Sequence, residues 1–338
     1  MEEKTGSKCR VLLLTESTLD IILEMEGTFP IAGGCSRRVK KTTFEPGGEG
    51  NIIIVFNRMG GSAMPTGPLG EDAYGEFLRN AYKEQGVDTS QLKVVEGFKT
   101  PVANCIIDEK GEHTFVSTLQ GCRFSEFEEV LKLLESCEGL FVSGYHVVDK
   151  DSDFFSLTLK LVSAAKQRGI PVFFDPGPLA DKIDKNALRE ILSSTTVISL
   201  NQEEAYLLTG NEDIEQAAAE LLTEMDGTVV VKSGGRGCYT ADKERKRWYS
   251  GFKVKAVDTM GAGDSFVGAL MYAWLSEFDR DTCFIFANAV GAAKAAKLGT
   301  GSKVPTFNEV VAILEQNGYN IPKICKKEGR FVELKLSC

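Results

Sequence analysis

Histidine is scarce in this chain, since only His113 and His146 occur among 338 residues. A multi-histidine metal centre or a nucleophile activated by histidine is therefore not expected. The nine cysteines are scattered singly, without a C-x-x-C pair, and predict neither a disulfide framework nor a zinc ribbon. We therefore expect the chemistry of this protein to use carboxylates, lysines and backbone groups.

The sequence also lacks long apolar runs and an excess of positive charge. No stretch reaches the roughly 18 consecutive apolar residues of a membrane span, and the acidic N-terminus has no signal-peptide core. Acidic residues outnumber basic ones by 48 to 39, which is opposite to a nucleic-acid-binding surface. Two short basic runs, 36–41 and 243–248, more often mark a solvated strand or turn. We expect a cytoplasmic protein with neither a membrane nor a nucleic-acid partner.

The apolar fraction, by contrast, is large at 43%, and it allows one large or two smaller α/β domains. Beyond residue 125, apolar strands alternate with helical segments, the clearest of which spans 151–168. The predicted strands are 140–145, 171–175, 196–201 and 228–235. This alternation predicts a mostly parallel sheet with helices on both faces.

Local signals mark three further helices. Residues 71–86 set apolar side chains on one face and end at Gly86, and residues 125–139 open with a capping box of Ser125 and Glu128. Residues that follow Asp264 repeat apolar side chains at helical spacing, namely Phe266, Ala269, Leu270, Ala273 and Trp274.

The N-terminal third has a different pattern. Residues 10–26, 37–46 and 102–117 indicate strands without intervening helices, and the last forms a hairpin that turns at 109–111. We expect a small antiparallel sheet, from segments near 15–46 and 95–122, that covers the main body of a single domain spanning 1–338. Residues 324–338 are a candidate edge strand without an assigned function.

The stretch VDTMGAGDSF at 257–266 carries the strongest chemical signal. Gly261, Ala262 and Gly263 join a strand to a helix and present backbone N–H groups at the positive end of the helix dipole, an anion hole for a phosphoryl group. Asp264, beside it, is placed to accept the proton of a hydroxyl that attacks the γ-phosphate of a nucleotide. The alternative is that an acidic residue simply suits a helix N-terminus.

Other nucleotide-binding motifs do not match. Phe266 stands at the third glycine position of G-x-G-x-x-G, and the chain has no G-x-x-x-x-G-K-[ST] motif. A dinucleotide fold or a P-loop is therefore not predicted. A G-A-G-D sequence on its own is also compatible with a plain tight turn, so its meaning depends on accompanying motifs.

Accompanying motifs occur in order along the chain: PGGEGN (46–51), GPLGEDAYGEFL (67–78), GVDTSQL (86–92), NQEEAYLLTG (201–210), VVVKSGGRG (229–237), VDTMGAGDSFVGAL (257–270) and GTGSKVPT (299–306). Together they resemble the ribokinase-like (PfkB-type) carbohydrate kinases. The resemblance implies a three-layer α/β/α sandwich with a small β-sheet lid. It also implies transfer of the ATP γ-phosphate to a sugar or nucleoside hydroxyl, with Mg²⁺ and possible use of K⁺.

The resemblance assigns roles to individual residues. Asp264 corresponds to the catalytic base, and Gly261, Ala262 and Gly263 form the anion hole. Asn201 and Glu204 match an N-x-x-E motif whose carboxylate acts on Mg²⁺ through water, although the same spacing is also a capping box. Residues that line the nucleotide would be Asn201, Lys232, Gly235, Gly237 and Asn288; Asn288 is also compatible with a solvent-facing helix position. Asp258 resembles a ligand of a monovalent cation, and otherwise it belongs to a strand-end turn.

On the acceptor side, Asp20 matches a carboxylate that binds sugar hydroxyls, and Gly48 with Asn51 matches a glycine-glycine-asparagine element. Two departures concern this site. GGEGN has two residues between the glycine pair and the asparagine where the family commonly has three, and Thr15 stands where glycine is frequent. Both departures bear on the identity of the acceptor.

The first hypothesis is therefore an ATP-dependent sugar kinase, with a homodimer through the lid as an expected assembly. A nucleoside kinase of the same fold is the alternative, and it would need an aromatic ring to stack on the base; the candidates are Phe29, Phe44, Phe98 and Phe115. A catalytically silent sugar- or nucleotide-binding regulator is a third hypothesis, which the retained Asp264 disfavours. A phosphosugar acceptor, with Arg37, Arg38 or Lys40 as the phosphate partner, ranks below a neutral sugar.

Overall fold

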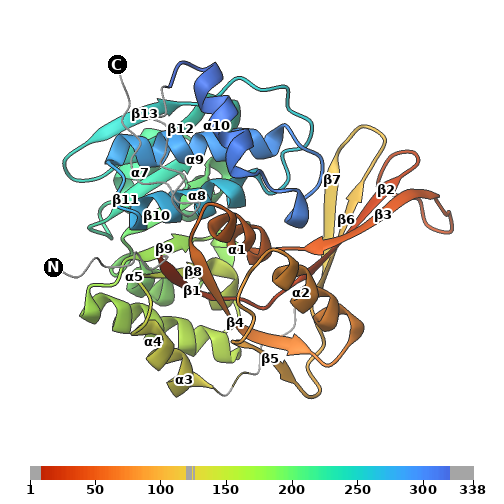
Figure 1. Cartoon of the computed structure of the whole chain (residues 1–338), viewed down its shortest axis with the longest axis horizontal. Helices are drawn as coiled ribbons and strands as arrows, with labels where there is room; N and C mark the ends of the chain where they lie inside the picture. The colour runs from red at the N-terminus through yellow and green to blue at the C-terminus, as the bar shows by residue number, and fades with distance from the viewer. Residues whose placement is uncertain (1–8, 119–123, 125, 320–338) are drawn as a thin grey trace.

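The computed structural model describes residues 9–118, 124 and 126–319, and it contains a large sheet flanked by helices and a smaller sheet that projects from one side (Figure 1). Among the described strands, nine form the large sheet in the order β13-β12-β11-β10-β9-β8-β1-β4-β5. Neighbouring strands are parallel from β10–β11 to β4–β5, while β12 and β13 add an antiparallel hairpin at one edge. The mostly parallel sheet expected from the sequence is confirmed.

The strands of the large sheet are β1 (Arg10–Leu14), β4 (Ser62–Gly70), β5 (Leu92–Val95), β8 (Gly139–Ser143), β9 (Val172–Asp175), β10 (Val197–Asn201), β11 (Thr228–Lys232), β12 (Gly237–Ala241) and β13 (Lys246–Ser250). The parallel strands β1, β8, β9, β10 and β11 in the middle of the sheet are rich in buried apolar residues, as a parallel sheet between two helical layers requires.

Two hydrophobic clusters, one on each face of the sheet, separate the helices into two layers. One layer holds α1 (Glu49–Arg58), α2 (Ala73–Glu84), α8 (Ala262–Leu275), α9 (Arg280–Ala295) and α10 (Phe307–Gln316). The other holds α3 (Phe127–Leu134), α4 (Asp153–Arg168), α5 (Lys185–Leu192), α6 (Gln202–Thr209) and α7 (Ile214–Leu221). The result is the expected three-layer α/β/α sandwich.

The small sheet, called the lid below, consists of β2 (Leu19–Met25), β3 (Val39–Pro46), β6 (Val102–Ile107) and β7 (His113–Ser117), in the order β3-β2-β6-β7. Its strands fall within the segments expected from the sequence. The prediction of a purely antiparallel sheet is wrong, because β2 pairs with β6 in parallel. These two strands come from separate hairpins, and α1, β4, α2 and β5 lie between them in the chain.

Two other local expectations need correction, and one helix was not expected. The strand expected at 10–26 divides into β1 of the large sheet and β2 of the lid. The helix expected from Ser125 begins at Phe127, with Glu126 at the N-cap position, while Ser125 itself and the candidate strand 324–338 lie outside the described residues. Helix α1 was not predicted at all. Within the described part of the chain, no helix has both the length and the apolar character needed to cross a bilayer.

Candidate active site

Helix α8 begins at the carboxyl edge of the large sheet with the GAGD sequence. Gly261 is the N-cap residue, with a positive φ of 71° that favours glycine. The amide of Ala262 donates to the carbonyl of Thr259 at 3.1 Å, so it is used inside the loop. Within the described residues no partner is recorded for the amides of Gly261 and Gly263. Of the three amides expected to form the anion hole, those of Gly261 and Gly263 are therefore available, and that of Ala262 is not.

Asp264 lies in the first turn of α8 and opens onto a cavity. The side-chain amide of Asn51 donates to Oδ2 of Asp264 at 3.0 Å, and Oδ1 of Asn51 accepts from the amide of Gly301 at 2.8 Å. Burial and the nearby Asp175 carboxylate raise the pKa of Asp264 to about 6, although Lys232 and Asn51 oppose the shift. A carboxylate with such a pKa is ionised at neutral pH and is a stronger base than an ordinary Asp.

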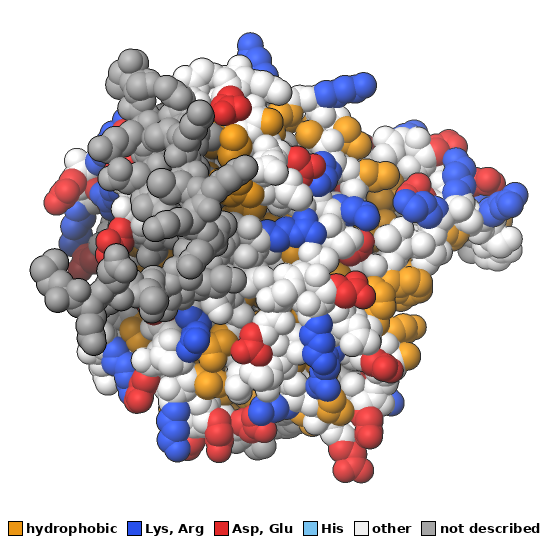
Figure 2. All heavy atoms as spheres, viewed as in Figure 1, with side chains coloured by type: hydrophobic (Ala, Val, Ile, Leu, Met, Phe, Trp, Pro, Cys, Tyr) orange, Lys and Arg blue, Asp and Glu red, His pale blue; other side chains and the backbone are white. Residues whose placement is uncertain are grey.

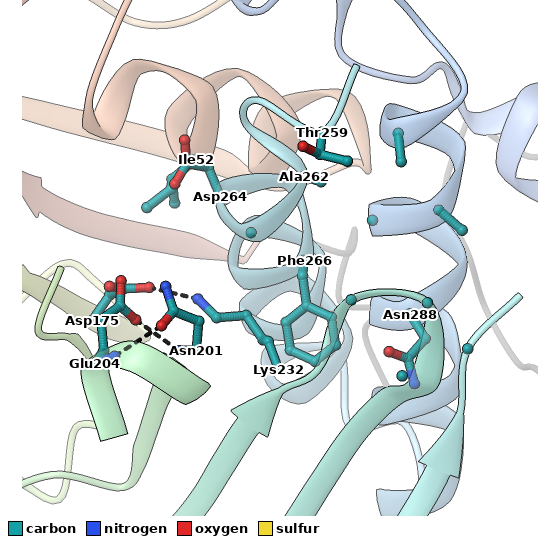
Figure 3. Close-up of a pocket in the computed structure, with 18 of the residues that line it drawn as sticks. Ile52, Asp175, Asn201, Glu204, Lys232, Thr259, Ala262, Asp264, Phe266 and Asn288 are labelled. Atoms are coloured by element: carbon teal, nitrogen blue, oxygen red, sulfur yellow. Dashed lines mark hydrogen bonds and ion pairs between the residues drawn. The ribbon is translucent and has the colours of Figure 1, made fainter. Parts of the chain in front are cut away.

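A second group of charges surrounds Lys232 at the end of β11. Its Nζ lies 3.0 Å from Oδ2 of Asp175, which ends β9, and 3.6 Å from the position that a Cβ of Gly263 would occupy. Burial lowers the pKa of Lys232, but the carboxylates of Asp175, Glu204 and Asp264 outweigh it and raise the pKa above its usual value. Figure 3 shows Lys232 reaching toward Asp175 and Asn201. An ammonium group thus lies beside the anion hole.

The N-x-x-E motif at 201–204 forms the capping box that its spacing allows. Oδ1 of Asn201 accepts from the amide of Glu204 at 2.8 Å, and Oε2 of Glu204 accepts from the amide of Asn201 at 2.7 Å. Glu204 nevertheless lines the cavity, and burial together with Asp175 raises its pKa to about 7, against the effect of Lys232. The carboxylate of Glu204 therefore caps α6 and also lines the cavity.

The described residues contain no cluster of three or more His, Cys, Asp or Glu side chains able to hold a metal ion by themselves. Asp175 and Glu204 supply two carboxylates at one end of the cavity. Two carboxylates, with water and phosphate oxygens completing the shell, suit Mg²⁺ better than a cation that needs an all-protein cage.

The cavity has a volume of about 860 Å³ and extends from Glu49 and Asp264 to the loop between β11 and β12 and to α9. Gly235, Gly237 and Asn288, all expected from the sequence, line it. Asn288 is only 7% exposed and donates to the carbonyl of Tyr249 at 3.3 Å, so it does not face solvent. The fold also requires glycine at position 237, because a Cβ there would lie 2.1 Å from the carbonyl oxygen of Tyr249. In Figure 3, Asn288 lies on the opposite side of the view from Asp175.

The residues expected on the acceptor side, Asp20, Gly48 and Asn51, lie where the lid meets α1. Asp20 of β2 is buried; burial, together with the carboxylates of Asp264 and Glu45, raises its pKa to about 7. A Cβ on Gly47 would lie 1.9 Å from Oδ1 of Asp20, whereas a Cβ on Gly48 meets nothing within 4 Å. The glycine that abuts the Asp20 carboxylate is therefore Gly47, which the sequence analysis did not select, and Gly48 forms the N-cap of α1 and lines the cavity.

Glu49 and His146 form a buried pair beside this site, and sequence reasoning missed both. Nε2 of His146 lies 3.5 Å from Oε1 of Glu49, and Thr15 donates to Oε2 of Glu49 at 3.3 Å. Burial raises the pKa of Glu49, but the hydrogen bond and charge of His146, a backbone amide and Ser143 together outweigh burial, so that the net pKa lies below its usual value. Glu49 therefore adds another ionised carboxylate to the cavity wall.

The inner face of the lid contacts the loops around the anion hole. Because side chains alternate along strands, register places Asp20, Glu45, Cys105, His113 and Phe115 on one face. Glu45 accepts from the amide and hydroxyl of Ser302 at 2.9 Å each, and Sγ of Cys105 lies 3.6 Å from Sδ of Met260. The lid, which carries Asp20, thus contacts the loop before α8 at Met260 and the loop at Ser302.

Asp258, expected near a monovalent cation, is buried at the start of the same loop. Its carboxylate accepts from the amides of Met260 at 2.9 Å and Gly299 at 2.8 Å. Nε2 of His113 from the lid lies 4.0 Å from Oδ1, and Nζ of Lys294 lies 3.9 Å from Oδ2. The turn that Asp258 forms therefore connects the anion hole, the lid and α9.

Comparisons with known proteins agree with the observed fold. Residues 10–307 match the family described as pfkB family carbohydrate kinase. The chain is 28% identical over 275 residues to ribokinase from Haemophilus influenzae, covering 80% of this chain and 87% of that protein. It is 29% identical over 336 residues to probable fructokinase-4 from Arabidopsis thaliana, covering 94% and 100%. The structure of Arabidopsis thaliana ribokinase complexed with ribose and ATP has a TM-score of 0.77 at 22% identity, covering 91% and 99% of the two chains.

Proposed function

Because this chain belongs to the pfkB family of carbohydrate kinases, which are phosphotransferases acting on sugar hydroxyl groups, we propose that it transfers the γ-phosphate of ATP to a hydroxyl of a neutral sugar. The observation that carries the proposal is the placement of Asp264. Its carboxylate accepts a hydrogen bond from Asn51 at the N-terminus of α8. Asp20 and Lys232 are close by, because the Asp264 carboxylate raises the pKa of Asp20 and the Lys232 ammonium opposes the rise in the pKa of Asp264. A base, an anion hole and a cation are thereby grouped at one end of a cavity.

The proposed chemistry assigns one task to each group. Asp264 accepts the proton of the acceptor hydroxyl as that oxygen attacks phosphorus. The amides of Gly261 and Gly263 and the ammonium of Lys232 stabilise the negative charge of the transferring phosphoryl group. Asn51 positions Asp264 and ties it to the amide of Gly301. Closure by the lid excludes water, the competing acceptor.

The carboxylates of Asp175 and Glu204, next to Lys232, suit a magnesium ion. When bound, Mg²⁺ neutralises phosphate charge and orients the phosphates for in-line transfer. Asp175 and Glu204 would hold it through water, since each already has a protein partner, Lys232 in one case and the amide of Asn201 in the other. The complex of Arabidopsis thaliana ribokinase with ribose and ATP supports the same pair of substrates for this fold.

Charge favours a neutral acceptor over a phosphosugar. Asp20, Glu45 and Glu49 surround the acceptor side, and a phosphate group there would face several carboxylates. The candidate phosphate partners of the lid are exposed and belong to its projecting end, where Figure 2 shows charged side chains. Arg38 lies beside Glu26, because the amide of Glu26 donates to the carbonyl of Arg38. Glu26 follows Asp20 by six residues, and at about 3.3 Å per strand residue this places Arg38 about 20 Å from Asp20.

One observation favours a nucleoside as the alternative acceptor. Phe115 is 54% exposed and lies on the inner face of the lid, paired across the sheet with Cys105. An exposed aromatic ring on this face could stack on a base. Phe44 and Phe98 fit less well, because Phe44 is on the opposite face against Phe77 and Phe98 is buried.

We also propose that the whole chain acts as one unit, with the lid as part of the active site, because Glu45 and Cys105 reach residues on both sides of the anion hole. The outer face of the lid carries the half-exposed side chains of Phe44 and Val116. A homodimer through the lid would cover such apolar surface. Sedimentation of the purified protein tests this assembly.

The test of the proposed function is an ATP-consumption screen with Mg²⁺ over pentoses, hexoses, sugar acids, phosphosugars and nucleosides. Turnover with a neutral sugar supports the proposal, and turnover only with a nucleoside supports the alternative. Phe115→Ala separates the two, because loss of a stacking partner should raise the KM of a nucleoside and leave that of a small sugar nearly unchanged. Binding of ATP without turnover on any acceptor would support the silent regulator.

We expect Asp20→Asn to raise the acceptor KM by about 10- to 100-fold and to leave the KM of ATP almost unchanged. A hydrogen bond to a charged partner contributes about 1.5–3 kcal/mol, which sets this range. Steady-state kinetics with each substrate varied in turn measure the two constants. Asp108→Asn, which changes a carboxylate at the outer end of the lid hairpin, is the matched control. Equal effects of Asp20→Asn on both substrates would contradict its assignment to the acceptor site.

We expect Glu204→Gln to raise the Mg²⁺ concentration needed for half-maximal turnover while changing stability little. The amide oxygen of glutamine can still accept from the Asn201 amide, so the capping box survives, and a complete loss of capping would cost only about 0.5–2 kcal/mol. A magnesium titration and a thermal melt on the same sample separate the effects. Glu309→Gln, at the capping box of α10, is the control. A melt shift with an unchanged titration would leave capping as the only role of Glu204.

A further inference from the structure

Lys294 is a fully buried lysine behind the anion hole. It occupies the last turn of α9, and its side chain is 0% exposed. Lysine is almost never completely buried unless polar groups surround its ammonium. The surroundings of this side chain therefore indicate what it does.

The ammonium of Lys294 is surrounded by oxygens. Nζ donates to the carbonyls of Asp258 and Lys297 at 3.2 Å each, and Oδ2 of Asp258 lies 3.9 Å away. The C-terminal end of α9 adds the negative end of a helix dipole. Backbone carbonyls and a carboxylate are the ligands that a hard metal cation takes, but here they surround a cation that belongs to the chain.

Two of these oxygens belong to Asp258, in the loop that leads to the anion hole. The Asp258 carboxylate accepts from the amide of Met260, the residue before Gly261, and the amides of Val257 and Asp258 donate to the carbonyl of Ala295 on α9. Position and charge at Lys294 are thus linked through Asp258 to Met260, the residue that precedes the anion hole.

Nearby carboxylates limit a downward shift of the pKa of Lys294. Burial and the charge of Lys297 lower this pKa below its usual value, and the carboxylates of Asp258 and Asp264 oppose the shift. His113 of the lid lies on the other oxygen of Asp258, 4.0 Å away. The side chain of Lys297 turns to the Glu309 carboxylate at 2.9 Å and does not compete for the same oxygens.

We propose that the ammonium of Lys294 replaces the monovalent metal ion implied beside Asp258, so that the anion hole keeps its working shape without K⁺. The residues present do not fit a bound K⁺, because the carbonyl and carboxylate oxygens that it would need already contact Nζ. Removal of the side chain beyond Cβ would free these oxygens and leave space for a small cation.

The first test is thermal unfolding in KCl and in tetramethylammonium chloride at equal ionic strength, which needs no acceptor and so does not depend on the proposed function. We expect the wild type to melt at the same temperature in both salts. Lys294→Ala should melt lower than the wild type and recover several degrees in KCl only. Lys166→Ala is the matched control, because Lys166 also lies in the last turn of a helix and donates to a backbone carbonyl, that of Ser193.

The second test, which rests on the proposed function, measures turnover in the same salts. Lys294→Ala should lose about tenfold in kcat in tetramethylammonium chloride, less than removal of a donor that touches the reacting oxygen, and K⁺ should restore part of the loss. A wild type that K⁺ activates or stabilises overturns the proposal, as does a Lys294→Ala protein that responds to neither salt. If Lys294→Ala does not fold, Lys294→Ser, whose short side chain also leaves space for a cation, replaces it under the same criteria, and the wild-type measurement alone still decides against the proposal.

Discussion

Asp264→Asn is expected to lower kcat by about 10²–10⁴-fold, the usual contribution of a general base, while ATP and acceptor still bind. Asparagine keeps the shape of the side chain, and its carbonyl oxygen can accept the hydrogen bond that Asn51 now donates to Oδ2. Because burial disfavours the ionised carboxylate, the neutral substitute should not destabilise the fold. Single-turnover kinetics and calorimetric titration with ATP on the same sample measure rate and binding separately.

The matched control is Asp213→Asn, which changes the N-cap carboxylate of α7 and should leave turnover unchanged. The wild-type pH profile adds an independent test of the base. With the pKa of Asp264 raised to about 6, the ionised form disappears as pH falls through 6, so kcat/KM should decrease below that value and level off above it. An Asp264→Asn protein that retains more than about a tenth of the wild-type rate would contradict the catalytic assignment.

Lys232→Met is expected to lower kcat by about 10²–10³-fold, the range found when one stabilising donor is removed from a developing negative charge. The same change breaks the contact with Asp175, and loss of one partner of a buried ion pair costs up to about 3–5 kcal/mol of stability. Lower stability alone could therefore reduce activity. Rates are to be measured at a temperature where circular dichroism shows that the variant is folded.

The double variant Asp175→Asn/Lys232→Met separates stability from chemistry. It removes both charges of the pair, so it should recover most of the lost stability and none of the lost rate. Recovery of the rate together with the stability would mean that Lys232 serves only to neutralise Asp175. The position of Nζ, 3.6 Å from where a Cβ of Gly263 would lie, is the reason that we expect the first result.

The spacing of apolar residues was sufficient to predict those helices and strands whose apolar residues form a regular pattern. Helix α8 follows the spacing of Phe266, Ala269 and Leu270, and the strands β8 to β11 are short apolar runs between helices. Helix α1 could not be found this way, because Ile52, Ile53, Ile54 and Val55 are all buried and show no polar face. Its β-branched run is helical because α1 packs closely on α8, where a Cβ on Gly268 would lie 2.9 Å from the carbonyl of Ile52.

Strand β4 was missed for the opposite reason. It contains Pro65, Gly67 and Pro68, which normally argue against a strand between two others. Gly67 is required by the tertiary structure, since a Cβ there would lie 2.0 Å from the carbonyl oxygen of Thr15. Contacts of this kind join segments far apart in the chain and leave no periodic signal.

The candidate site shows the same limit. Asp264 and the loop before it belong to one contiguous motif, which the sequence analysis singled out. Asp175 follows a buried strand, a position from which it could have been selected, but Glu49, His146 and Lys294 gain their meaning only from partners elsewhere in the fold. The sequence analysis selected Gly48, which lines the cavity, whereas the contact of Gly47 with Asp20 is visible only in the fold.

The bonds made by Asn51 have a consequence for how the protein is made. Asn51 is 213 residues from Asp264 and 250 residues from Gly301, and Glu45 is 257 residues from Ser302. Contacts over such separations close long loops and form late in folding. A nascent chain that has emerged from the ribosome only as far as α7 has the lid and most of the large sheet, but it has neither α8 nor the loop that carries Gly301. During refolding, native-like circular dichroism should therefore appear before the ability to transfer phosphate.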